Sequence, residues 1–134
     1  MKIPILTLDT PNKNNRIYPR AVMEKVIAKY KKDFVDEKRA FIVKKQPENT
    51  VVNLQDVIGL INEVTFENDK VVVDVQFFPN VPEGLIMETA VSDGKLHVRT
   101  SGLGTMHRQE NGTYIVGEDY ELINVFITNE SPQK

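Results

Sequence analysis

The strongest pattern of apolar and polar positions is a pair of apolar runs at residues 57–66 and 70–78, separated by the short polar stretch 67–69. In the second run Val71, Val73 and Val75 alternate with other residues, so one face of a strand would be continuously apolar. Two runs of this kind joined by a short link with Asn and Asp predict a β-hairpin.

Shorter apolar runs predict further strands. Pro4 suits a strand at the edge of a sheet, where its missing N–H is not needed. Asn111 followed by Gly112 is the strongest short hairpin signal in the chain. The further strands are expected at residues 3–8, 40–43, 96–100, 105–110, 113–116 and 121–128.

Two segments predict helices. Pro19 fits the first position of a helix that runs to about Phe34. Its apolar residues recur at three- and four-residue spacing, at Met23, Val26, Ile27, Tyr30 and Phe34. The second helix begins near Asn80 and ends near Gly94, a typical C-terminal cap. Its expected buried set is Leu85, Ile86, Met87, Ala90 and Val91.

The order of these elements predicts an α+β fold, with two helices and a mainly antiparallel sheet that can close into a barrel. A chain of 134 residues is long enough for one domain with a substantial core. We therefore expect a single domain over residues 1–134, with a short polar tail from about residue 130.

Composition excludes several classes of function. The chain has 40% hydrophobic and 27% charged residues, which is typical of a globular domain. Without cysteine there is no disulfide and no thiol nucleophile, and two histidines without metal-ligand spacing predict no metal site and no cofactor. No apolar stretch is long enough to span a membrane, and the first residues do not resemble a signal peptide. The net charge of −2 argues against a nucleic-acid partner.

Residues 97–104, His-Val-Arg-Thr-Ser-Gly-Leu-Gly, are the one stretch that suggests catalysis. On an extended strand His97 lies roughly 13 Å from Ser101, and it points away from the face of Thr100. A general base must come within about 3 Å of the hydroxyl it activates, so His97 serves neither hydroxyl unless the strand bends sharply. His107 could approach only through tertiary folding. The two glycines fit either an oxyanion pocket or a bend in the strand.

Four stretches in order resemble the prohead (head-maturation) proteases of T-even-like tailed phages, which share their fold with the herpesvirus assembly protease. Residues 14–19 (N-N-R-I-Y-P) resemble that family's N-G-R-x-Y-P, and residues 46–57 (Q-P-E-N-T-V-V-N-L-Q-D-V) resemble the D-H-P-E-N-P-x-V-N-L-x-x-V segment that includes its histidine. Residues 96–104 (L-H-V-R-T-S-G-L-G) resemble L-G-V-S-S-R-G-L-G. Residues 119–132 resemble its closing D-F-x-L…F-D-I-V…P stretch. The resemblance implies the prohead-protease fold.

The resemblance also implies where catalytic residues would stand, and this chain departs from the family there. Gln46 replaces the histidine, and a glutamine amide cannot accept the proton of a nucleophile. Arg99 and Thr100 stand at the serine positions, Ser101 at the arginine position and Phe126 at the aspartate position. These substitutions predict a catalytically degenerate site with no catalytic residue, cofactor or metal.

Our first expectation from these departures is a non-enzymatic virion protein, an auxiliary or decoration (cement) protein on the phage head. It would be made in the bacterial cytoplasm and bind the major capsid protein or other head proteins, with possible self-association and no nucleic-acid or membrane partner. Its expected anchors are Tyr30, Phe34, Phe77, Phe78 and Tyr114.

Two alternatives stay open. One is an active serine- or threonine-type prohead maturation protease, with Thr100 or Ser101 as nucleophile and His97 or His107 as a rewired base. The other is a transient capsid assembly factor that binds the scaffold and leaves.

Overall fold

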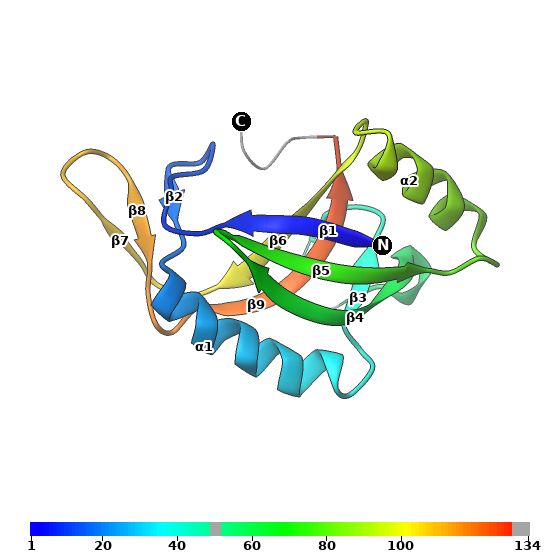
Figure 1. Cartoon of the computed structure of the whole chain (residues 1–134), viewed down its shortest axis with the longest axis horizontal. Coiled ribbons are helices and arrows are strands. Elements are labelled where there is room, and N and C mark those ends of the chain that lie inside the picture. The colour runs from blue at the N-terminus through cyan, green and yellow to red at the C-terminus, as the bar shows by residue number, and fades with distance from the viewer. Residues whose placement is uncertain (49–51, 130–134) are drawn as a thin grey trace.

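In the computed structural model, residues 1–48 and 52–129 are described. They form two helices and two sheets, shown in Figure 1. The resembling segment 46–57 includes residues 49–51, and these residues and the predicted tail from 130 lie outside the described residues. The elements are β1 (Lys2–Thr7), β2 (Arg16–Ile17), α1 (Arg20–Tyr30), η1 (Lys31–Val35), β3 (Phe41–Val43), η2 (Leu54–Asp56), β4 (Val57–Glu67), β5 (Lys70–Phe77), α2 (Pro82–Ser92), β6 (His97–Leu103), β7 (Met106–Arg108), β8 (Tyr114–Val116) and β9 (Glu121–Thr128).

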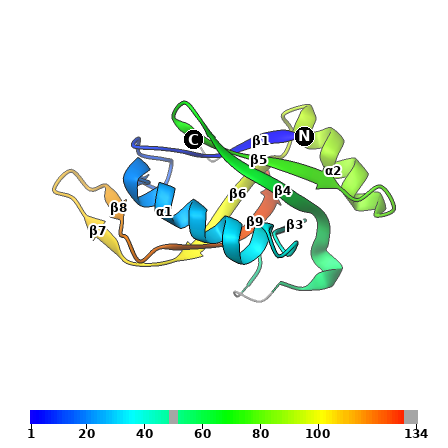
Figure 2. The ribbon, with the colours of Figure 1, turned by 60° about the horizontal axis from the view of Figure 1, so that its bottom comes forward.

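The main sheet has six strands in the order β1-β5-β4-β3-β9-β6. Its strands pair antiparallel except β3 and β9, which run parallel. The two end strands, β1 and β6, approach each other without hydrogen-bonded pairing, so the sheet curls into a nearly closed barrel (Figures 1 and 2). The predicted α+β class with a mainly antiparallel barrel is confirmed, and Pro4 lies on an edge strand as expected.

Helix α1 is positioned by the apolar stripe expected from the sequence. Pro19 caps it with φ −64°, and Met23, Val26, Ile27 and Tyr30 are buried in the core. A π-helical turn, η1, continues the helix to Val35, and the ring of Phe34 stacks on Tyr30 at 5.0 Å. The predicted end near Phe34 is therefore correct, although the last turn has a wider winding than an α-helix.

Helix α2 is placed correctly, but its predicted buried set is correct only in part. Leu85 is 45% exposed and Ile86 is 68% exposed, while Gly84 is the buried residue of the helix. A Cβ atom on Gly84 would lie 3.1 Å from the carbonyl oxygen of Ile58, so the helix backbone contacts β4 there. The helix packs on the end of the barrel through this close approach and through the half-buried Met87 and Val91, while Leu85 and Ile86 stay exposed.

A second sheet of three strands, in the order β2-β8-β7, extends away from the barrel (Figures 1 and 2). The predicted Asn111–Gly112 turn joins β7 and β8. The side-chain oxygen of Asn111 accepts hydrogen bonds from the backbone N–H and the hydroxyl of Thr113, and Gly112 has φ +87°. The two-residue strand β2, which pairs parallel with β8, is too short for the sequence pattern to show.

Candidate functional site

The register of β6 and β9 decides which side chains share a face. Arg99 lies opposite Phe126, Thr100 opposite Val125, and Ser101 opposite Asn124. Because side chains alternate along a strand, Arg99 and Ser101 point to one face and Thr100 to the other. Val125 and Ile127 belong to the core, so Phe126 and Asn124 lie on the outer face of the barrel with Arg99 and Ser101.

Strand β3 brings Gln46 close to the β6 and β9 residues described above. Val43 at the end of β3 lies opposite Phe126 of β9, and Gln46 follows three residues later. A cavity of about 310 Å³ is lined by all five positions predicted from the resemblance: Gln46, Arg99, Thr100, Ser101 and Phe126. Its other lining residues are Asn14, Arg16, Tyr18, Gly102, Gly104, Met106, Val116 and Tyr120.

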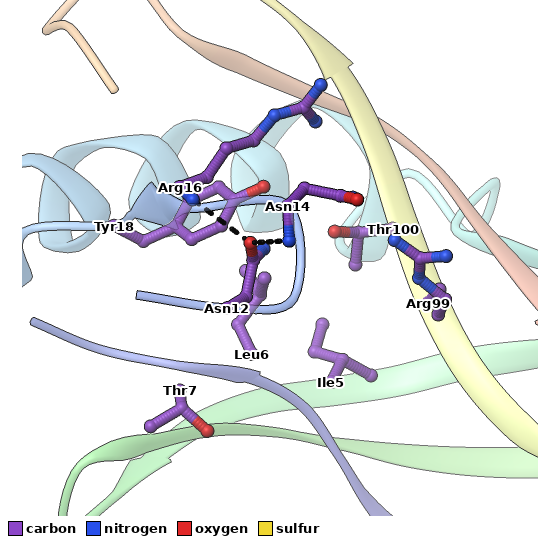
Figure 3. A pocket seen from close by; sticks show the side chains of 9 residues that line it. All are labelled: Ile5, Leu6, Thr7, Asn12, Asn14, Arg16, Tyr18, Arg99 and Thr100. Atoms are coloured by element: carbon purple, nitrogen blue, oxygen red, sulfur yellow. Dashed lines mark hydrogen bonds between the residues drawn. The ribbon is translucent and has the colours of Figure 1, made fainter. Parts of the chain in front are cut away.

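Thr100 and Arg99 line this cavity and also a smaller neighbouring pocket, which Figure 3 shows and which Ile5, Leu6, Thr7 and Asn12 line as well. Figure 3 shows Thr100 and Arg99 on different sides of the strand, with Thr100 directed to the segment that holds Asn12 and Asn14. The Asn12 side-chain oxygen accepts hydrogen bonds from the backbone N–H of Asn14 (2.8 Å) and of Arg16 (3.1 Å) (Figure 3). This turn fixes the wall of the cavity that faces Thr100.

The two glycines of the 97–104 stretch allow Tyr120 to approach β6. A Cβ atom on Gly102 would lie 2.3 Å from the carbonyl oxygen of Glu121 and 2.5 Å from the Tyr120 hydroxyl. One on Gly104 would lie 2.5 Å from the Tyr120 Cα. The expected irregularity of the strand is present, because the register shifts between Ser101 and Gly102, although β6 continues to Leu103. The glycines also permit a close contact with Tyr120 that the sequence does not show.

Tyr120 stands in the cavity wall as a neutral phenol. Its ring meets that of Tyr18 edge to face, with centroids 5.9 Å apart. Burial raises the pKa of Tyr120 well above its usual value, and the neighbouring Tyr18 raises it further. Tyr120 is therefore a hydrogen-bonding group in this site and does not become a base near neutral pH.

The described lining of the cavity is cationic. Arg16 and Arg99 contribute guanidinium groups, while no aspartate or glutamate of residues 1–48 and 52–129 lines it. Such a lining favours negative charge, either on a bound carboxylate or on an oxyanion that forms during a reaction.

Neither histidine lines the cavity. His97 begins β6 opposite Thr128, four residues before Ser101. His107 lies between Met106 and Arg108 on β7, so it points away from the face on which Met106 meets the cavity. The geometry therefore does not support the alternative in which His97 or His107 is the general base for Thr100 or Ser101.

His107 instead lies near Asp119, at the base of the small sheet. The Asp119 carboxylate accepts hydrogen bonds from the Thr105 hydroxyl (2.6 Å) and the Thr105 backbone N–H (3.0 Å). These bonds lower the pKa of Asp119, and the charge of His107 adds a smaller effect in the same direction. The contact joins the start of β7 to the segment before β9.

Asn124 is the residue of this region that sequence reasoning missed. It is 6% exposed, and its side-chain oxygen has no hydrogen-bond partner. The available signal was a single amide in the apolar run Leu-Ile-Asn-Val-Phe-Ile of the last strand.

Within the described residues, no group of three or more histidine, aspartate or glutamate side chains comes together to hold a metal ion. In the same part of the chain, no helix has the length and apolar character needed to cross a membrane.

The sequence matches the family described as prohead core protein serine protease over residues 5–128, so the chain belongs to that family. This confirms the resemblance and gives the protein the context of phage head assembly. Among solved structures, the capsid assembly protease of bacteriophage T4 is similar to this chain, with a TM-score of 0.82 and 21% sequence identity. The match covers 94% of this chain and 79% of that one, and it shows the same fold. No curated protein matches the sequence.

These findings correct the expected function. The family match points to a protease of the prohead, and nothing supports the decoration or cement protein, the structural role or the non-enzymatic reading. The expected anchors fail in part as well, because Tyr30 is 3% exposed and Phe77 is 6% exposed, both inside the core. That Gln46, Arg99, Thr100, Ser101 and Phe126 form a degenerate site with no catalytic residue stays a prediction.

Proposed function

We propose that this protein is a prohead maturation protease that cleaves head proteins during phage capsid assembly in the bacterial host. The observation that carries the proposal is the gathering of Gln46, Thr100, Ser101 and Phe126 in one cavity, in a chain whose family is defined by serine proteolysis. The four residues come from three separate parts of the chain, which meet through the β3–β9–β6 pairing.

The nucleophile of the proposed reaction is the hydroxyl of Thr100 or Ser101, since both line the cavity. The hydroxyl oxygen attacks the carbonyl carbon of the substrate peptide, and the amine leaves with the proton that the hydroxyl loses. Water then releases the acyl group from the protein. The guanidinium groups of Arg16 and Arg99 supply positive charge for the oxyanion or for an acidic substrate side chain.

The described cavity lining supplies no imidazole or carboxylate to accept the hydroxyl proton. Gln46 cannot do so, and the raised pKa of Tyr120 keeps its phenol protonated. The proton must therefore pass to water or to a carboxylate that arrives with the substrate. We expect cleavage about a hundredfold or more slower than with a positioned histidine, because a general base contributes roughly that much.

The proposed partners are the major capsid protein and other head proteins, and the proposed place of action is the prohead. The T4 relative is named as a capsid assembly protease, which supports both. The net charge of −2 and the cavity chemistry add no argument for nucleic acid.

The test is cleavage of head proteins in proheads assembled with the wild-type chain or its variants, read by mass spectrometry of new peptide ends. We expect wild type to produce defined cuts. The double variant Thr100→Ala with Ser101→Ala should lose them by about a hundredfold or more, since nucleophile removal costs at least that in related mechanisms.

Thr65→Ala is the matched control, because Thr65 is an exposed strand hydroxyl on β4, outside the cavity. It should leave every cut unchanged. Uncut head proteins with wild type, or equal cutting by the double variant, would overturn the proposed function.

A further inference from the structure

Asn124 is buried beside the proposed nucleophiles and has an unsatisfied side-chain oxygen. It is 6% exposed, and its Oδ1 atom has no hydrogen-bond partner in the structure. Buried polar atoms nearly always have partners, so one without a partner in a native fold calls for a physical reason. Leucine or valine would fill the same strand position without that cost.

The nearest donor that the β-sheet register offers to this oxygen is the Ser101 hydroxyl. Ser101 lies directly opposite Asn124 across the β6–β9 pair. Directly opposite side chains of an antiparallel pair have Cβ atoms about 5 Å apart and point to the same face. A serine hydroxyl can rotate to donate across that distance to an asparagine carboxamide.

The sheet also separates Ser101 from Thr100. Thr100 lies opposite Val125 and points to the other face of β6, toward the Asn12–Asn14 turn (Figure 3). Asn124 therefore faces only one of the two candidate nucleophiles. A register shift between Ser101 and Gly102 places a β-bulge at this point, a feature that often re-aims a side chain beside an active site.

We propose that Asn124 is a positioning residue for Ser101, whose hydroxyl donates to the Asn124 Oδ1 atom when a peptide enters the cavity. This hydrogen bond fixes the Ser101 rotamer with its oxygen lone pairs toward the substrate carbonyl, so Ser101 and not Thr100 attacks. As the new bond forms, the hydroxyl proton leaves Ser101 for water or for a carboxylate of the substrate. Asn124 takes no proton in the reaction. The inference rests on the proposed protease function and adds to it the identity and orientation of the nucleophile.

The first experiment labels the full-length protein with a fluorophosphonate, which reacts with nucleophilic serine hydroxyls, and maps the modified residue by mass spectrometry. We expect labelling at Ser101 in wild type. Asn124→Leu should lower the labelling rate about tenfold or more, whereas Asn124→Asp, which keeps an acceptor oxygen and adds a carboxylate that can take the proton, should label at least as fast as wild type. Asn62→Leu is the matched control, because Asn62 is an exposed amide on β4.

The second experiment measures turnover of a peptide that spans a cut found in proheads. Asn124→Leu should lower kcat with little change in KM, since a positioning residue acts on the bound substrate. The same substitution should have its full effect in a Thr100→Ala background. Thermal unfolding of each variant shows whether it is folded, and the residue that is labelled in the wild type, Ser101 or Thr100, tests the inference if Asn124→Leu does not fold.

The outcomes separate the two claims. Labelling at Thr100, or equal labelling rates for Asn124→Leu and wild type, would overturn the inference. Defined cuts in proheads would still support the proposed protease function. If the wild-type protein shows neither prohead cleavage nor labelling, both the inference and the proposed protease function are overturned.

Discussion

At the scale of single residues, the proposed site depends on which side chains the paired strands bring together. Gln46, Phe126 and Ser101 meet in one cavity although they are far apart in sequence. The described lining of this cavity has no histidine or carboxylate to accept a proton, and Gln46 lies where the resemblance implies the histidine. A single substitution at one of these positions should therefore raise or lower the proposed cleavage activity.

Gln46→His should increase prohead cleavage by about tenfold or more, because an imidazole would accept the hydroxyl proton. The gain should appear as pH rises through about 6.5, since only the neutral imidazole is a base. A pH profile of peptide cleavage checks both points. Gln76→His, at an exposed glutamine of β5, is the control and should leave the profile unchanged.

Gly102→Ala should destabilise the fold by about 1–3 kcal/mol, because the added methyl group would overlap the Glu121 carbonyl oxygen and the Tyr120 hydroxyl. Urea unfolding measures the loss. Leu103→Ala, at the next residue, is 57% exposed in the native chain and should change the free energy of unfolding by less than about 0.5 kcal/mol. Equal effects of the two would contradict the packing argument.

At the scale of elements, the cavity depends on contacts between segments that the sequence pattern treats separately. The Thr105–Asp119 hydrogen bonds join the segment between β6 and β7 to the segment before β9. They keep the backbone of Gly104 packed against the backbone of Tyr120.

Asp119→Asn should lower stability at pH 7 and should make no difference at strongly acidic pH. The folded state lowers the pKa of Asp119 below its usual value near 3.8, so this carboxylate stabilises the fold above that pH. The contribution is lost as pH falls through the lowered pKa. Thermal unfolding of both proteins across pH 2 to 7 checks the sign, with Glu118→Gln at the exposed neighbouring carboxylate as control. A gap between wild type and Asp119→Asn that persists at the acid end would exclude this account.

Particular elements show how far sequence reasoning reaches. The β4–β5 hairpin, α1 and the Asn111–Gly112 turn follow from local periodicity and turn chemistry, which are properties of neighbouring residues. Leu85 and Ile86 of α2 were wrongly predicted to be buried because periodicity shows which residues share a face and not whether another element covers it. Gln46 and Phe126 were placed by resemblance alone, since the parallel β3–β9 pair that joins them is a tertiary contact. Asn124 was missed because its interest arises only from burial and register.

At the scale of the whole molecule, one core supports both ends of the described chain. Buried residues from β1, α1, β3, β5 and β9 form a single cluster around the inside of the barrel. The expectation of a single domain therefore becomes a prediction of one cooperative transition on unfolding.

Ile42→Ala tests this cooperativity. Ile42 is 0% exposed on the central strand β3, and its truncation should cost about 2–5 kcal/mol. The loss should appear equally in far-ultraviolet circular dichroism and in tyrosine fluorescence. Ile86→Ala removes the same atoms from a side chain that is 68% exposed, and it should cost less than about 0.5 kcal/mol. Separate transitions for the two probes would show that the chain contains more than one folding unit.

The parallel β3–β9 pair also has a consequence for the timing of protein synthesis. Phe126 and Asn124 lie on the last strand, and that strand separates β3 from β6 in the sheet. A chain still emerging from the ribosome holds Gln46 and Ser101 without the strand that joins them, so the cavity cannot exist before β9 has been translated and has docked. Under the proposed function, this order of assembly would prevent the chain from cutting its neighbours, or itself, during its own synthesis.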